Sequence, residues 1–314
     1  MTAAAPAPPG PALPVAGLDR LRPLLQEVGD AKRVRTAQAG GPAPGSLAEQ
    51  AFGRAWARLV DGEDAEQVAL SETAAAVARA RLAGIDAAVL QRAGLDAGQA
   101  LDVLRRGYDE LAEAVPSAVR TRLRDALPLV RTAAGAPPAL VAALNAQPRA
   151  GATAPGRPRL VVEPPESHGD HCFTVAVYGV LVSPLVGADP VVPFLVGLAH
   201  HLHNVTLPDA GFAGEVLLGD HLLPVIDELE RQELDRLPRA LGDRLRGLLG
   251  LRADAVAPES QAFHAADVLD RVLQVHHHAR AAAFTAEQAL DDLDLVHEGP
   301  VQAFHLDVLR SAGL

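Results

Sequence analysis

Four side chains in the C-terminal half are of types that bind divalent metal ions: His171, His200, His201 and Asp267. Neutral imidazole nitrogens and one anionic oxygen together suit a divalent transition metal such as Zn, Fe, Mn, Co or Ni. Each of these residues lies in or beside an apolar segment, and apolar walls limit the access of water. The sequence therefore predicts one metal ion held by these four side chains.

The segments around these residues resemble the HD-domain superfamily of metal-dependent phosphohydrolases, most closely its 5′-deoxynucleotidase-like branch. The branch has a Glu-Ser-x-Ala-(Asp/Glu)-His opening, and this chain has Glu166-Ser-His-Gly-Asp-His171. The late Ala-Asp-x-Leu-Asp helix of the family is matched by Ala266-Asp267-Val-Leu-Asp270. The resemblance covers about the last half of the chain. It implies a helical bundle that hydrolyses a small phosphorylated molecule, with a nucleotide as one candidate substrate.

The chain departs from the family at the His-Asp doublet, where it has His200-His201. The family's Asp can bridge two metals because a carboxylate has two oxygens, whereas an imidazole offers one nitrogen. A single metal is therefore expected rather than a dinuclear centre. An alternative register remains open, in which His203-Asn204 takes the place of the doublet.

In the register with His200-His201, the resemblance places Asp209 at the family's catalytic Asp, where it would position or deprotonate the attacking water. Asn204 then replaces the family's Glu, and an amide cannot act as a general base. Arg157 and Arg159 precede the opening motif, roughly where related enzymes place a phosphate-binding Arg. His221 is a further candidate, as an additional ligand or a substrate contact.

The elements that position these residues are expected to be helices. Hydrophobic residues make up 49% of the chain and aromatic residues only 3%, and strand-like alternation is rare. This composition favours an all-α fold. The uncharged run Cys172–Gly187 is short for a bilayer and contains Pro184, so it is expected to be a buried core helix. In the first half, helices are expected over 47–60, 64–83, 97–114, 117–132 and 137–146.

Similar segments recur at an offset of about 121 to 125 residues, which favours a tandem duplication of one helical domain. We therefore expect a disordered tail over 1–16, a degenerate HD-like helical domain over 17–146, a linker over 147–158 and an HD-like metal-binding domain over 159–314. At the ligand positions of the first copy stand Gln50, Ala75, Ala76 and approximately Ala146, none of which binds a metal well.

The net charge of −11 argues against a nucleic-acid polymer as partner, because such binding needs a basic face. The single cysteine, Cys172, excludes an intrachain disulfide and fits a reducing cytoplasm. The N-terminus lacks the pattern of a signal peptide, and no membrane association is expected. The apolar stretch Val301–Leu314 would suit a homodimer contact or a cap on the bundle.

Two other functions remain open. A catalytically degenerate HD-like binding or scaffold protein is favoured by the inert first copy and by His201 and Asn204. An iron-dependent HD oxygenase is the third hypothesis, although such enzymes need two irons and more histidine ligands than this chain places together.

Overall fold

The computed structural model describes residues 17–35, 45–130, 135–161, 163–254, 256–282 and 302–312. Within these ranges the regular structure is helical and contains no strand, apart from two isolated bridges, so the all-α prediction is confirmed. The tail predicted over 1–16 lies outside the described residues.

The first half of the chain contains α1 (Leu18–Gly29), η1 (Asp30–Lys32), α2 (Leu47–Val60), α3 (Ala65–Ala80), α4 (Ala87–Arg92), α5 (Ala97–Leu111), η2 (Ala112–Ala114), α6 (Ser117–Ala126), η3 (Leu127–Leu129) and α7 (Ala139–Ala146). The second half contains α8 (His168–Val186), α9 (Val191–Ala199), η4 (Leu202–Val205), α10 (Gly211–Leu218), η5 (Gly219–His221), α11 (Leu222–Asp235), α12 (Arg239–Leu249), η6 (Gly250–Ala253), α13 (Pro258–Ala282) and α14 (Gln302–Ala312).

The helix expected over 117–132 is shorter than predicted, because α6 ends at Ala126. Pro128 follows, and proline supplies no N–H for a continuing α-helix, so the chain passes into the 3-10 helix η3. The other expected helices of the first half correspond to α2, α3, α5 and α7, with ends that differ by a few residues.

The chain divides into two units, Met1–Arg271 and Val272–Leu314. The boundary falls within α13, so the second unit holds the end of α13 and all of α14. In the second unit Gln274 and His278, one helical turn apart, approach to 3.3 Å.

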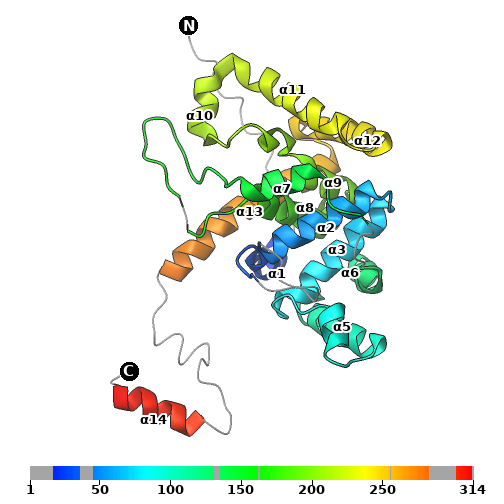
Figure 1. Cartoon of the computed structure of the whole chain (residues 1–314), viewed down its shortest axis with the longest axis vertical. Coiled ribbons are helices and arrows are strands. Elements are labelled where there is room, and N and C mark those ends of the chain that lie inside the picture. The colour runs from blue at the N-terminus through cyan, green and yellow to red at the C-terminus, as the bar shows by residue number, and fades with distance from the viewer. Residues whose placement is uncertain are drawn as a thin grey trace. The chain divides into compact units, whose positions relative to one another are not determined.

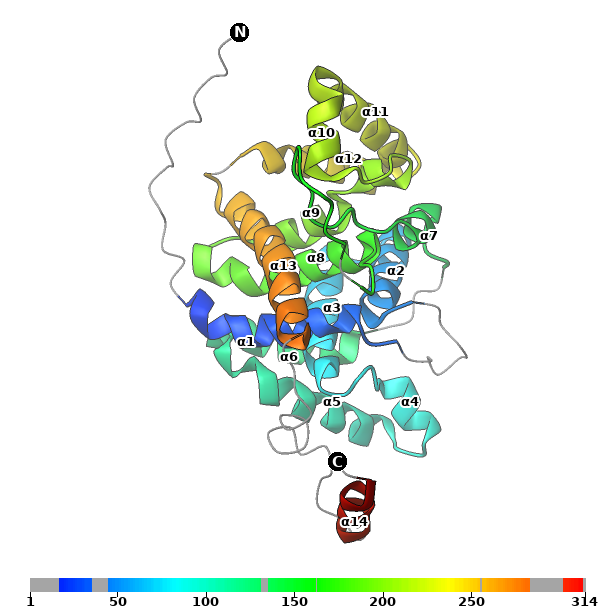
Figure 2. The same ribbon diagram turned by 90° about the vertical axis from the view of Figure 1, so that its left-hand side faces the viewer.

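The core of the first unit forms around α8, which lies in the middle of the bundle (Figures 1 and 2). Helices α2, α3, α7 and α9 all pack against it, and α1 contacts it as well. Its residues from His168 to Ser183 are all buried. Helices of both halves of the chain therefore share one core, and α8 brings its first residues into the middle of it.

One described helix, α8, is long and apolar enough to cross a membrane by length and composition alone, and 83% of the relevant window is buried inside the protein. This burial agrees with the core helix that the sequence predicts.

Local sequence explains where α8 begins. The Ser167 side chain accepts a hydrogen bond from the Asp170 backbone N–H, and Asp170 accepts one from the Ser167 backbone N–H. This reciprocal capping box satisfies two N–H groups that a helix start leaves without partners. It fixes the first turn, which carries His168 and His171.

Helices α8 and α9 approach each other closely near the end of α9. A Cβ on Gly197 would lie 2.6 Å from the backbone N and Cα of Ala176, so only glycine allows this spacing. His200 follows one turn later as the C-cap of α9. The two helices therefore place the end of α9 beside the start of α8.

Candidate metal centre

Three helices bring the predicted metal-binding side chains together. His171 comes from the first turn of α8, His200 from the end of α9, and Asp267 from α13 within the first unit. The Nε2 atom of His171 lies 3.1 Å from Nε2 of His200 and 3.3 Å from Oδ1 of Asp267. Both histidines are buried, and Asp267 is partly exposed.

The hydrogen bonds at the opposite side of each ring fix its tautomer. Nδ1 of His171 lies 2.7 Å from Oδ2 of Asp270, and Nδ1 of His200 lies 2.8 Å from the Gly197 carbonyl oxygen. Both partners are acceptors, so each Nδ1 carries the proton. When both rings are neutral, Nε2 of His171 presents its lone pair to Nε2 of His200 and to the Asp267 carboxylate.

Three acceptors that converge without a donor repel one another unless a cation lies among them. The carboxylates Asp267 and Asp270 keep the pKa of His171 raised, although burial and then Arg149 act to lower it. Burial and then His171 lower the pKa of His200 well below its usual value. Either a proton on Nε2 of His171 or a metal ion would thus satisfy these contacts.

The spacing fits a metal ion. With ligand bonds of 2.0–2.1 Å, the edge of a tetrahedral site is about 3.3 Å. The two separations measured from Nε2 of His171 are 3.1 and 3.3 Å. Burial acts to raise the pKa of Asp267, but the hydrogen bond to His171 and its charge hold that pKa well below the usual range, so the carboxylate is anionic. The donor types and the two separations from His171 therefore suit a divalent transition metal.

His201 also belongs to the cluster, since ligand atoms of His171, His200 and His201 all lie within 4.8 Å of one another. However, its Nε2 lies 2.6 Å from an Nη1 of Arg149. A guanidinium only donates, so Nε2 accepts that bond and Nδ1 donates to Oδ1 of Asn204 at 2.7 Å. His201 can bind the metal only if Arg149 moves away.

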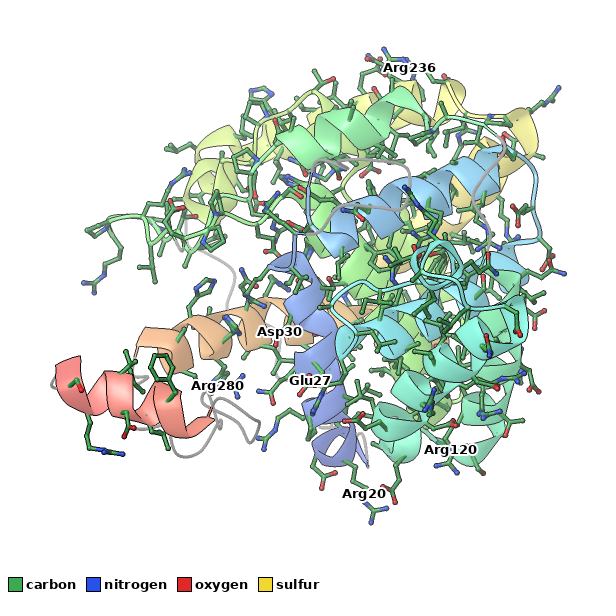
Figure 3. All side chains as sticks on the ribbon, turned by 60° about the horizontal axis from the view of Figure 1, so that its bottom comes forward. Arg20, Glu27, Asp30, Arg120, Arg236 and Arg280 are labelled. Carbon is green, nitrogen blue, oxygen red and sulfur yellow. The ribbon has the colours of Figure 1, made fainter. Side chains whose placement is uncertain are left out.

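A second group of candidate ligands, Glu166, His171 and Asp270, also lies within 4.8 Å. The ammonium of Lys32 sits between its carboxylates, 2.6 Å from Oε1 of Glu166 and 2.6 Å from Oδ1 of Asp270. Lys32 belongs to η1, which directly follows α1. In Figure 3, the labels Arg20 and Asp30 mark the start of α1 and the start of η1. The Lys32 ammonium thus supplies the positive charge of this second group. The first cluster therefore remains the candidate metal site.

Beside His201 lies a further histidine, His168, at a ring-centroid distance of 5.0 Å. Its Nδ1 donates to the Gln147 carbonyl oxygen at 3.0 Å, and its buried Nε2 has no hydrogen-bond partner. That Nε2 is 3.7 Å from Oδ2 of Asp209. Burial lowers the pKa of His168 to about 4, so the ring is neutral and its free lone pair faces a carboxylate.

Asp209, predicted as the residue that positions or deprotonates the attacking water, is held by two backbone N–H groups, from Ala150 and Gly211, at 2.9 Å each. Burial acts to raise its pKa, but these bonds and Arg149 lower it overall. Asn204 is buried and donates to the Leu207 carbonyl oxygen while its Oδ1 accepts from His201. Its role in this arrangement is to orient His201.

The structure does not bring the other predicted residues to the cluster. Arg157, Arg159 and His221 are exposed, and Arg159 donates to the Ala210 carbonyl oxygen. Among the described residues, none of the three contacts an imidazole of the cluster.

Sequence reasoning missed three residues of this region: Arg149, His168 and Lys32. His168 stands inside the Glu-Ser-x-x-x-His opening itself, three positions before His171, so it lies on the same side of α8. Lys32 is the only lysine in the chain, and this singularity is a feature that the sequence alone shows. Arg149 lies in the segment that was predicted to be a linker, and nothing in its local sequence indicates its position beside His201.

Comparison of the chain with protein-family models, curated proteins and solved structures finds no match.

Proposed function

We propose that the protein is a hydrolase of small phosphorylated molecules that uses one divalent transition metal held by His171, His200 and Asp267. The observation that supports this most directly is that Nε2 of His171 lies 3.1 Å from Nε2 of His200 and 3.3 Å from Oδ1 of Asp267. A metal ion at this position would polarise a phosphoryl oxygen and lower the pKa of a bound water.

Arg149 is the group we assign to the phosphoryl oxygens. It lies beside the cluster, and its present partner is the neutral ring of His201 rather than a carboxylate. A guanidinium binds phosphate more strongly than it binds a neutral imidazole, because both partners are charged and the contact can be bidentate. When Arg149 turns to a phosphoryl group, Nε2 of His201 becomes free to serve as a fourth ligand.

His168 is the group we assign to proton acceptance. Its neutral Nε2 has no partner, and the Asp209 carboxylate 3.7 Å away would stabilise the imidazolium formed when it takes a proton from water. His168 and Asp209 would together take the role of the Glu that the HD superfamily has at the position of Asn204.

We also propose that the fold is a tandem pair of HD-like bundles, of which the first is degenerate. In support, α2 and α8 both begin with a capping box, formed by Ser46 with Glu49 and by Ser167 with Asp170. Helices α6 and α12 both follow an N-cap proline, and each is followed by a 3-10 helix.

The first experiment is elemental analysis of the untagged full chain after reconstitution with Mn, Fe, Co, Ni or Zn. We expect about one equivalent of metal per chain, with loss in His200→Ala and in Asp267→Asn. The matched control is His221→Ala, which removes an exposed histidine outside the cluster. If neither cluster variant changes the metal content, the proposed site is wrong.

The second experiment separates hydrolysis from metal binding alone. Each metal-loaded protein is incubated with nucleoside monophosphates, sugar phosphates and p-nitrophenyl phosphate, and released phosphate is measured. We expect turnover that His171→Ala abolishes and that Arg149→Met lowers strongly.

A non-catalytic binding protein is the second candidate, and the contact between Arg149 and His201 favours it because it occupies one imidazole. A full equivalent of metal with no phosphate release from any substrate would support that candidate over the hydrolase.

A further inference from the structure

A second candidate binding site lies in the first half of the chain, in a cavity of about 790 Å³. Helices α2, α3, α5 and α7 contribute to its lining. The volume lies within the range of small-molecule sites, about 300–1,000 Å³. Its walls are largely apolar and include Ala57, Ala75, Ala78, Leu101, Leu104 and Val141.

One charged group in this lining lacks a counter-ion. Arg79 of α3 is 8% exposed, its Nη2 donates to the Gly84 carbonyl oxygen at 3.2 Å, and its Nε has no hydrogen-bond partner. Within the part of the chain that the structure describes, no carboxylate lies within ion-pair distance of it.

The other charged groups of the lining are already satisfied. Arg54 forms a salt bridge of 2.6 Å with the buried carboxylate of Glu72. Glu49 accepts the backbone N–H of Ser46 at 2.8 Å, and Asp86 accepts that of Val89 at 2.9 Å. Of the two arginines in this lining, Arg79 is therefore the one that has no carboxylate partner among the described residues.

A buried guanidinium without an anion is unfavourable, because desolvation is not repaid by a charge partner. Burial and then the nearby Arg54 lower the pKa of Arg79 to about 10, although the more distant carboxylates of Asp86 and Glu72 act to raise it. The unpartnered Nε of this buried guanidinium and the cavity beside it together indicate that an anionic ligand is missing from an otherwise largely apolar space.

We propose that this cavity binds a small organic anion, whose carboxylate or phosphate pairs with Arg79 and whose apolar body lies against α5 and α7. The cavity is also lined by Gln50 and Ala75, two of the positions that the duplication equates with metal ligands. The first bundle would then have exchanged a metal site for an organic-anion site. This inference stands on the cavity and does not depend on hydrolysis at the second site.

The test uses isothermal titration calorimetry on the metal-loaded full chain with three ligands of the same apolar body: decanoate, decyl phosphate and decanol. We expect one saturable site for at least one of the two anions and binding at least tenfold weaker for neutral decanol. Comparison of the two anions decides between a carboxylate and a phosphate ligand.

The decisive variant is Arg79→Met, which should weaken binding of the anion about ten- to hundredfold, the effect of losing charge-assisted hydrogen bonds. The matched control is Arg81→Met, which removes an exposed arginine two residues away and should leave binding unchanged. Because Arg79 lacks a counter-ion, the ligand-free Arg79→Met protein should melt at the same temperature as the original or higher.

A second variant tests the cavity independently, in case Arg79→Met does not fold. Leu101→Trp introduces a large ring into the cavity from α5, which should weaken binding of the anion and leave the fold intact. The proposal is overturned if neither anion binds at millimolar concentration, if decanol binds as tightly as the anions, or if a folded Arg79→Met protein keeps the original affinity.

Discussion

Oδ2 of Asp270 lies 2.7 Å from Nδ1 of His171, and this single contact decides which nitrogen of the ring faces His200. The other oxygen of the same carboxylate accepts a bond of 2.6 Å from Lys32. A metal-binding imidazole that donates its second N–H to a carboxylate has a fixed tautomer and higher basicity. Asp270 is thus a positioning residue for the candidate metal centre, and Lys32 fixes Asp270 in turn.

Replacing Asp270 by asparagine should weaken metal binding about 10- to 100-fold. The amide oxygen would keep the Lys32 bond, so the NH₂ group would face Nδ1 of His171 and move the ring proton to Nε2. Competition with a chromogenic chelator measures the affinity. Asp243→Asn, on the exposed face of α12, is the matched control. Unchanged affinity in a folded Asp270→Asn protein would contradict the assigned tautomer.

Replacing Lys32 by methionine should lower the free energy of unfolding by about 3–5 kcal/mol, because it leaves two nearly buried carboxylates, Glu166 and Asp270, without their cation. Urea unfolding followed by circular dichroism measures the change. Arg81→Met removes an exposed cation and should change the free energy of unfolding by less than about 0.5 kcal/mol. A loss of stability no larger than that of the control would mean that the Lys32 contacts contribute little.

Replacing Glu230 by glutamine should destabilise the protein by about 2 kcal/mol near neutral pH. Glu230 holds both terminal nitrogens of Arg252 at 2.6 Å, and that arginine also donates to the His200 carbonyl oxygen. Burial acts to raise the pKa of Glu230, but bonds from His203 and Arg252 lower it overall.

The pH dependence of that effect follows from the lowered pKa. The stability that ionised Glu230 contributes is fully present above its unfolded pKa, about 4.3, and is lost as pH falls through the lower folded pKa. The difference in melting temperature between the two proteins should therefore be constant from pH 8 to 6 and shrink below pH 4. Glu228→Gln, on the exposed face of the same helix, should show little change. A difference that grows on acidification would refute this linkage.

The helices and the positions of two predicted ligands, His171 and Asp267, follow from local sequence. Ser167 and Asp170 specify the start of α8 through a capping box, and this places His171 in the first turn. The Ala-Asp-x-Leu-Asp pattern contains both Asp267, whose Oδ1 lies 3.3 Å from Nε2 of His171, and Asp270, which orients His171. Such relations lie within one or two turns of a helix, which is the range over which sequence periodicity is informative.

The remaining parts of the site depend on contacts between distant segments. Lys32 pairs with carboxylates 134 and 238 positions away, and Arg149 reaches His201 across 52 positions. Neither contact follows from spacing along the chain, since it depends on how α1 and the 147–161 segment pack on α8. For the same reason, Arg157 and Arg159 stand at the sequence positions expected for a phosphate-binding Arg, but both side chains are exposed to solvent.

The close packing of α8 and α9 gives the last prediction. Gly197→Ala should destabilise the protein by about 1–3 kcal/mol, because its Cβ would meet backbone atoms of Ala176 at 2.6 Å and backbone cannot rotate away as a side chain can. Separation of the two helices would also move His200 away from His171, so metal affinity should fall together with the melting temperature. The matched control is Gly247→Ala in α12, where nothing lies within 4 Å of the added Cβ and the gain in helix propensity should stabilise the protein by about 0.5–1 kcal/mol. If Gly197→Ala loses stability but keeps its metal affinity, the spacing of these helices serves the core rather than the site.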